Sequence, residues 1–328
     1  MQMLLKEKNK QLIYRIINKS LADLYSKRKH RLKLPIKDFL VSIVMLSFNR
    51  VEDTIIALRE IYKHTKVPFE VIVFDNSSDE EELSILRKFV RKYPKLKLIE
   101  SPENLGCAKG RSEAIKYAKG EYYLFVDNDI IVTPHYLENL LYVLQNNEKT
   151  VAVCSKVIFP DLTIQFNGGT MNETEDYYIF NLLDSGKFFW QGDTTDNYQT
   201  CPWVPGGATL WKSKFYKKFP IDPRMEGSFE DNEVCVRINK AGYNLRNCPR
   251  SLVIHYHMNF KDVQFRDREK KYIDGRYNNQ RTGNALKHFW KVHKKVFVFN
   301  VEEATYGFLG LPLTKEKIIK YLKNKDGK

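Results

Sequence analysis

The sequence predicts an α/β domain with a mixed, mostly parallel sheet between helices, and three observations lead to this prediction. From Val41 onward, short apolar segments alternate with amphipathic segments, the order expected of strand–helix–strand units. The apolar segments end at polar or acidic residues, which surround the ligand site in such sheets. The chain of 328 residues is 43% hydrophobic and 29% charged, which suits a globular protein with a large core.

The first part of this domain is predicted to contain four strands, at residues 41–46, 70–74, 96–99 and 121–126. Between them lie segments whose apolar residues recur every three or four positions, the period of a half-buried helix. We expect the third helix to begin within residues 104–111 and to end at Gly120, because glycine is common just after a last helical turn.

Polar residues follow several of these strands. Since the carboxyl ends of parallel strands meet at one edge of a sheet, we expect these residues to share one crevice. They are Ser47, Asp75, Asp127 and Asp129.

Asp127 and Asp129 stand two residues apart, so on an extended segment their side chains point the same way. Paired carboxylates suit Mg²⁺ or Mn²⁺, which complete their coordination with water and phosphate oxygens. A turn at the strand end is an equally good interpretation of these residues alone, because Asp and Asn are favoured in turns.

The segment 104–111 contains glycines but matches neither the dinucleotide-binding nor the Walker pattern. Arg111, near the start of a helix, could contact a nucleotide phosphate or base, or could be an exposed surface residue.

The second part of the domain has fewer signals. Residues 151–158 are predicted as a strand, and residues 160–200 as a loop-rich stretch whose aromatic residues either stack on a sugar or pack locally. Residues 203–211 are predicted as another strand, with Gly206 and Gly207 at positions where another group must come close.

Two further segments carry candidate catalytic or metal-binding groups. Glu230 and Asp231 open a helix, where acidic residues complement the helix dipole; the same field would keep a general base ionised and oriented. The strand 251–257 ends with His255 and His257 on one face. No third zinc ligand is near in sequence, so one histidine joining the aspartates around a divalent metal is the more economical interpretation.

The net charge of +14 is confined to the two ends of the chain: it is +8 in residues 1–38, +9 in residues 258–328 and −3 between them. Both basic ends are predicted to be largely helical. The first has the pattern of an amphipathic helix, which either lies on an anionic membrane surface or packs on the main domain. Five scattered cysteines, without a paired spacing, and the lack of a long apolar run predict a cytoplasmic protein.

Together these segments resemble the family 2 glycosyltransferases of the GT-A fold. The matching segments are residues 41–50, 73–77, 104–111, 120–129 and 229–231 and the strand ending at His255, all in the order typical of that family. The sequence departs from the family pattern at Ser112, where Asn is frequent, and His257 is a rival to His255.

The resemblance implies an inverting enzyme that contains a D-x-D motif and uses Mn²⁺ or Mg²⁺. It implies metal ligation by Asp129, Asp127 and His255, and a catalytic pair in which Asp231 is the base and Glu230 its neighbour. It implies an acceptor site near Trp203, Gly206 and Gly207. The nucleotide-sugar site would include Ser47, Asn49, Arg50, Asp75, Asn76, Gly106, Arg111, Asp127 and Asn128.

The resemblance also implies a domain division and a reaction. Residues 39–257 would form the catalytic domain, with residues 39–132 binding the nucleotide sugar and residues 133–257 the acceptor. The expected donor is a UDP-sugar, with a dTDP-sugar as the alternative, and the expected acceptor is a hydroxyl in cell-surface polysaccharide or glycolipid assembly. A sugar nucleotidyltransferase and a basic membrane- or nucleic-acid-binding protein are the competing hypotheses. The acidic middle of the chain argues against nucleic acid as a partner.

Overall fold

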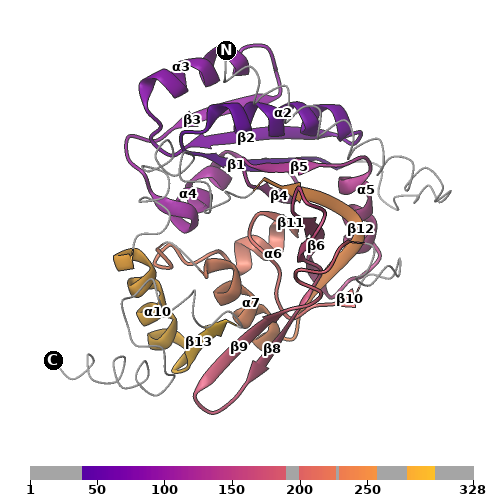
Figure 1. Cartoon of the computed structure of the whole chain (residues 1–328), viewed down its shortest axis with the longest axis vertical. Coiled ribbons are helices and arrows are strands. Elements are labelled where there is room, and N and C mark those ends of the chain that lie inside the picture. Colours follow the sequence, from indigo (N-terminus) through magenta and orange to yellow (C-terminus); the bar gives the residue numbers. More distant parts are fainter. Residues whose placement is uncertain (1–38, 190–198, 227–228, 257–278, 300–328) are drawn as a thin grey trace.

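The structure, a computed structural model, describes residues 39–189, 199–226, 229–256 and 279–299 (Figure 1). The amphipathic helix predicted within residues 1–38, residues 258–278 and 300–328 of the basic carboxyl end, and with them His257, lie outside the described residues.

The first half of the domain is a parallel β/α unit. Buried Val and Ile residues form its strands, whose order in the sheet is β4-β1-β2-β3. The elements are β1 (Val41–Ser47), α2 (Val51–His64), β2 (Phe69–Asp75), α3 (Glu80–Val90), β3 (Leu96–Glu100), α4 (Gly106–Ala114), a 3-10 turn (Ile115–Tyr117) and β4 (Tyr122–Val126). All four predicted strands of this half are present.

The second half extends the same sheet in the order β10-β12-β6-β11-β4 and adds antiparallel pairs. Strand β11 is antiparallel to both β4 and β6, whereas β12 is parallel to β6. The elements are β5 (Ile130–Val132), α5 (Tyr136–Gln145), β6 (Thr150–Ile158), β7 (Ile164–Phe166), β10 (Gln199–Thr200), β11 (Ala208–Lys212), α6 (Ser213–Lys218), α7 (Glu230–Lys240) and β12 (Asn244–His255).

A separate sheet, in the order β13-β9-β8, lies below the main sheet in Figure 1. It consists of β8 (Gly169–Glu173), β9 (Tyr177–Leu182) and β13 (Val296–Phe299), beside helix α10 (Asn279–His293). Tyr178 and Phe180 are buried, and their rings pack near Phe289 and Phe297. For these two residues, local packing is therefore the correct interpretation of the aromatic stretch.

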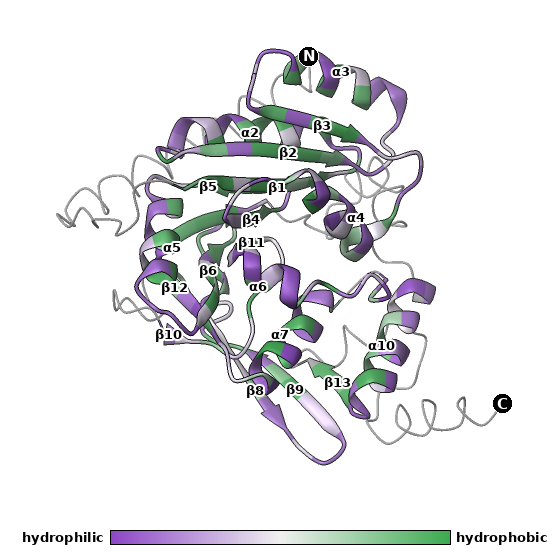
Figure 2. Ribbon diagram, turned by 180° about the vertical axis from the view of Figure 1, so that it is seen from behind, coloured by the Kyte–Doolittle hydropathy of each residue, from purple (hydrophilic) through white to green (hydrophobic). Residues whose placement is uncertain are grey.

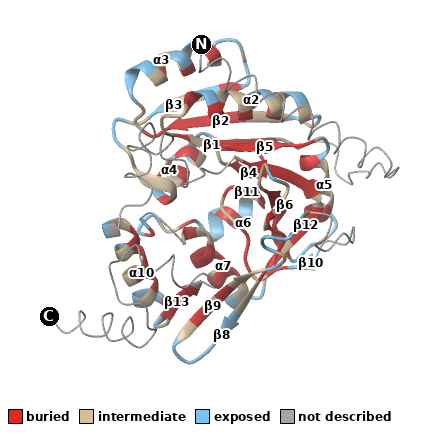
Figure 3. Cartoon of the chain, viewed as in Figure 1, coloured by how far each residue is buried: buried red, intermediate tan, exposed pale blue. Residues whose placement is uncertain are grey.

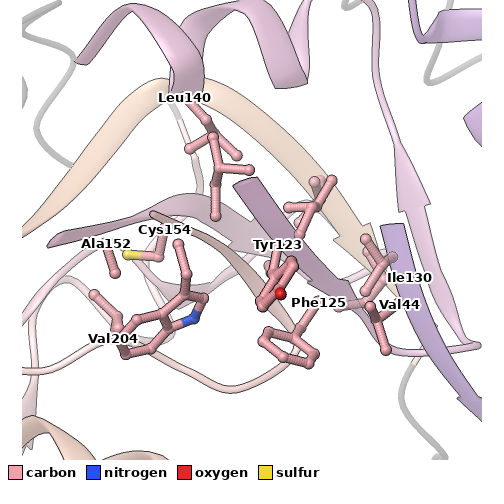
Figure 4. Packing of buried hydrophobic residues seen from close by; sticks show 14 of the residues in the cluster. Val44, Tyr123, Phe125, Ile130, Leu140, Ala152, Cys154 and Val204 are labelled. Atoms are coloured by element: carbon pink, nitrogen blue, oxygen red, sulfur yellow. The ribbon is translucent and has the colours of Figure 1, made fainter. Parts of the chain in front are cut away.

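One hydrophobic cluster includes the buried residues of the main sheet and reaches those of the small sheet and α10. Figure 2 shows hydrophobic residues concentrated in β1, β2 and β5, and Figure 3 shows these strands buried and much of α3 exposed. Tyr123 and Phe125 of β4 lie near Val44 and Ile130 in Figure 4. The ring centroids of Phe125 and Tyr216 are 5.1 Å apart. This packing anchors β4, the strand that leads into Asp127.

Three expected boundaries were wrong. The stretch 160–200 contains strands β7, β8 and β9 rather than mainly loop, and β11 begins at Ala208 rather than at residue 203. Gly120 does not cap α4, which ends at Ala114. A side chain at Gly120 would collide with the backbone of Leu40, 2.6 Å from its carbonyl oxygen. The glycine is required by a close approach of two chain segments, not by a helix end.

None of the helices in the described part of the chain has both the length and the hydrophobicity that crossing a bilayer requires.

Candidate active site

The pairing of strands brings the predicted D-x-D segment next to the end of β12. Asp129 directly precedes β5, whose first residue, Ile130, pairs with His255. The backbone N–H of Tyr256 donates to the carbonyl oxygen of Asp129 at 2.8 Å. Segments more than a hundred residues apart in the sequence are therefore joined by main-chain hydrogen bonds.

Asp127, Asp129 and His255 form what we call the Asp–His cluster. One candidate ligand atom from each residue lies within 4.8 Å of the others. Asp129 and His255 are buried, and Oδ1 of Asp129 is 3.1 Å from Nε2 of His255. Two carboxylates and one imidazole are a donor set that suits Mn²⁺ or Mg²⁺, so these residues fit the metal that the sequence predicted.

Arg50 fixes the orientation of Asp129. Its Nη1 donates to Oδ2 of Asp129 at 3.1 Å, and its Nη2 lies 2.8 Å from Asp53. Asn49 and Arg50 have φ angles of 50° and 55°, a left-handed turn that ends β1 and begins α2. The side chain of Asn49 accepts the backbone N–H of Asp79 at 2.8 Å, which connects this turn to the loop after β2.

Asp75 is buried at the end of β2, opposite Ser47 in the sheet register. Its two carboxylate oxygens accept the backbone N–H and the hydroxyl of Ser78 at 2.8 and 2.5 Å. Burial raises the pKa of Asp75, although the hydrogen bonds from Ser78 lower it. The hydroxyl of Ser47 contacts that of Thr54 at 3.3 Å, and Asn128 donates to the same Thr54 oxygen at 3.0 Å.

Asn76 shapes the loop before α4. Its side-chain N–H donates to Asn104 and to the carbonyl oxygen of Gly106 at 3.2 and 3.3 Å, and its oxygen accepts the N–H of Leu105 at 2.9 Å. Gly106 has a φ of 73°, which favours glycine at this turn. Asn76 and Gly106 therefore lie close together, and the contacts described for them are with other residues of the protein.

Arg111, Glu230 and Asp231 form a second group, which we call the Arg111 cluster. The buried guanidinium of Arg111 donates to Glu230 at 2.7 Å and to Asp127 at 2.8 Å, so it joins the two clusters. Asp231 accepts the backbone N–H of Gly206 at 3.0 Å and that of Asn232 at 2.9 Å. Burial and the negative charge of Glu230 raise the pKa of Asp231 to about 7, while Arg111 lowers it.

Gly206 and Gly207 leave room for these charged groups. A Cβ atom at Gly206 would overlap with Nη1 of Arg111, and one at Gly207 would overlap with Oδ2 of Asp127. The groups that were expected to come close to these glycines are thus side chains of the protein itself, Arg111 at Gly206 and Asp127 at Gly207. Trp203 is buried, with its ring centroid 4.9 Å from that of Phe166. The acceptor role of these three residues stays a prediction.

The structure adds residues that sequence reasoning missed. Gln165 contacts His255, Thr54 contacts Asn128, and Glu233 contacts His293. None belongs to a recognisable motif. The alternation of Ile164, Gln165 and Phe166 was the one available signal that Gln165 lies on a strand with its side chain away from the core.

Comparison with known proteins agrees with the geometry. Residues 42–204 match the sequence profile of the glycosyl transferase family 2. An uncharacterized glycosyltransferase of Methanocaldococcus jannaschii is 26% identical over 265 residues, which cover 80% of this chain and 83% of that protein. The chain spans between 14% and 43% of the length of the other curated relatives considered.

Two solved structures share the fold. The crystal structure of GalNAc-T7 with UDP, GalNAc and Mn²⁺ has a TM-score of 0.57 and 17% identity, over 79% of this chain and 56% of that chain. The mannosyltransferase PcManGT of Pyrobaculum calidifontis, in complex with GDP-Man and Mn²⁺, has a TM-score of 0.51 and 15% identity, over 92% of this chain and 89% of that chain.

The fold is therefore that of the GT-A glycosyltransferases. The chain belongs to glycosyltransferase family 2, as the ordered motifs predicted.

Proposed function

We propose that this glycosyltransferase moves a sugar from a nucleotide-diphosphate sugar to an acceptor hydroxyl, with inversion at the anomeric carbon and with a divalent metal. The observation that carries the proposal is the position of Arg111. Its guanidinium contacts Asp127 at 2.8 Å and Glu230 at 2.7 Å, so the candidate metal ligands and the candidate base belong to one site.

Asp127, Asp129 and His255 would hold Mn²⁺ or Mg²⁺. When bound, the ion supplies Lewis-acid stabilisation of the negative charge on the nucleoside diphosphate leaving group. Both related structures contain Mn²⁺, one with UDP and the other with GDP-Man, which supports this assignment.

Asp231 would act as the general base. It removes the proton from the acceptor hydroxyl while that oxygen attacks the anomeric carbon from the face opposite the leaving group. A pKa near 7 suits this role, because a base works best when its pKa lies near the operating pH. One displacement without a protein nucleophile inverts the anomeric centre, as in the inverting glycosidases.

Residues 39–132 would bind the donor, with Asp75 at the base or ribose and Ser47 beside it. Both carboxylate oxygens of Asp75 already accept hydrogen bonds from Ser78, but an ionised carboxylate has about four acceptor positions and keeps capacity for a ligand. Residues 133–257 would bind the acceptor. The donor would be a UDP-sugar, with a dTDP-sugar as the alternative.

The basic ends, residues 1–38 and 258–328, would hold the enzyme at an anionic membrane face on the cytoplasmic side, where glycolipid and polysaccharide precursors are assembled. This suits a lipid-linked or cell-surface acceptor.

The proposal is tested with a panel of UDP-, dTDP- and GDP-sugars in the presence of Mn²⁺. We expect selective binding of one donor in a calorimetric titration, and slow release of the nucleoside diphosphate without an acceptor. Release of pyrophosphate would instead indicate a nucleotidyltransferase. Failure of every donor, combined with nucleic-acid or vesicle binding that weakens steeply with salt, would overturn the proposal.

A further inference from the structure

Strand β7 contains a β-bulge at Gln165. Its neighbours pair with adjacent residues of β6, Phe166 with Val157 and Ile164 with Ile158. Gln165 is therefore the extra residue of the strand. A bulge changes the direction of a side chain, and bulges are frequent next to active sites. Ile164 and Phe166 are buried in the core, whereas Gln165 is half-buried.

The side chain of Gln165 contacts the Asp–His cluster. Its oxygen, Oε1, lies 2.7 Å from Nδ1 of His255. With the amide in this orientation its oxygen accepts a hydrogen bond, so Nδ1 is the nitrogen that carries the proton and donates it. In a neutral imidazole the other nitrogen, Nε2, then presents a lone pair. This nitrogen lies 3.1 Å from Oδ1 of Asp129, another candidate metal ligand of the Asp–His cluster.

We propose that Gln165 is a positioning residue that fixes His255 in its metal-binding tautomer. The inference rests on the proposed function, since it assigns Gln165 to the metal of that site. Outer-shell partners of this kind orient ligating histidines, and their loss typically weakens metal binding ~10–100-fold. The reverse orientation of the amide would give the opposite tautomer, with Nε2–H directed at Asp129.

Holding β7 in place does not require this side chain. The backbone N–H of Ile164 donates to Lys187 at 2.7 Å, and its carbonyl oxygen accepts the N–H of Gly186 at 2.9 Å. At the hairpin end, the N–H of Phe159 donates to Thr163 at 2.8 Å. Main-chain hydrogen bonds therefore hold β7 in place. The contact from Gln165 to His255 is not needed for this, and its role is to orient the imidazole ring of His255.

The first test reads the tautomer without any metal, by ¹⁵N NMR of the imidazole nitrogens at a pH where His255 is neutral. His255→Gln identifies the resonances. We expect the proton on Nδ1 in the native protein and in Gln165→Glu, because a carboxylate also accepts from Nδ1–H. In Gln165→Leu we expect the imidazole proton to move largely from Nδ1 to Nε2. Gln145→Leu, which removes another half-buried glutamine, is the matched control.

A proton on Nε2 in the native protein, or an unchanged tautomer in Gln165→Leu, would overturn the inference.

The second test measures Mn²⁺ binding by electron paramagnetic resonance, with the metal alone and with circular dichroism as a check of folding. We expect Gln165→Leu to bind Mn²⁺ ~10–100-fold more weakly, and Gln165→Glu and Gln145→Leu to stay close to the native protein. If native protein and Asp129→Asn bind Mn²⁺ equally, the proposed metal site fails. If Asp129→Asn loses Mn²⁺ and Gln165→Leu does not, the role of Gln165 alone fails.

Discussion

The Asp–His cluster and the Arg111 cluster lie side by side but are built differently. Main-chain pairing of β5 with β12 sets Asp129 beside His255. The Arg111 cluster depends on a single long side chain that reaches from α4 to the first turn of α7. We expect side-chain changes in the Asp–His cluster to weaken metal binding and to leave the fold intact. Changes in the Arg111 cluster should instead alter the stability of the protein and the pH dependence of its activity.

The largest expected effect is on folding. Arg111→Leu would leave Asp127 and Glu230 as partly buried carboxylates without their cation, which typically destabilises a protein by ~3–5 kcal/mol. Arg87 is the matched control, because it also bridges two carboxylates but is much less buried than Arg111. Arg87→Leu should change stability far less, because solvent screens its contacts with the two carboxylates. Chemical denaturation measures both, and equal losses would show that burial does not distinguish the two bridges.

Asp129→Asn tests the first cluster. The amide keeps the shape of the side chain and an acceptor for Arg50, so the melting temperature should change little. Loss of a direct ligand should weaken Mn²⁺ binding by more than the ~100-fold upper value for outer-shell partners. Calorimetry with and without EDTA gives the metal affinity. A donor titration unaffected by EDTA would remove the metal from the mechanism.

Asp231→Asn tests the base. Turnover should fall at least ~100-fold, a typical contribution of general-base catalysis, while donor affinity stays within about twofold. Asp161→Asn, an exposed aspartate on the loop between β6 and β7, is the control and should keep full turnover. Undiminished turnover in Asp231→Asn would mean that another group takes the proton.

A smaller effect concerns pH. Because Asp231 must be ionised to act, kcat/KM should fall about tenfold for each pH unit below 7.

The stability of the protein should instead rise as the pH falls below 7. The folded protein holds this proton more tightly than the unfolded chain, where the pKa is near 3.8, so this stabilisation is full below about pH 4 and is lost as the pH rises through 7.

Melting temperatures of the native protein and Asp231→Asn between pH 6 and 8 test the sign. The variant cannot ionise at this position and should lose less stability over that range. A steeper loss in the variant would contradict the raised pKa.

The sequence was most informative where parallel strands end. Ser47, Asp75 and Asp129 follow buried apolar runs, and the sheet brings Ser47 opposite Asp75 as expected. Arg111 connects Asp127 to Glu230 in the first turn of α7, and the sequence did not predict this contact. A sequence motif gives residue types at a spacing, whereas the partner of a long, buried arginine depends on which carboxylates surround it after folding.

Other features could not be read from the sequence because they arise from tertiary packing. Gly120 was predicted to end a helix because glycine is common after a last helical turn. In the structure its lack of a side chain allows the backbone of Leu40 to approach. Gln165 reaches His255 because β7 contains one extra residue, and nothing in the sequence around it indicates a bulge.

Helix α10 contacts parts of the chain that lie far apart in the sequence. Arg281 donates to the carbonyl oxygen of Asn104 at 3.1 Å, beside α4, while His288 and His293 reach Asp222 and Glu233 at 2.9 and 3.1 Å. The residues that match the family profile end at 204, before α7 and α10 begin. Fragments trimmed to that match would lack Asp231, His255 and the contacts of α10, so a protein expressed for assays needs to extend at least through residue 299.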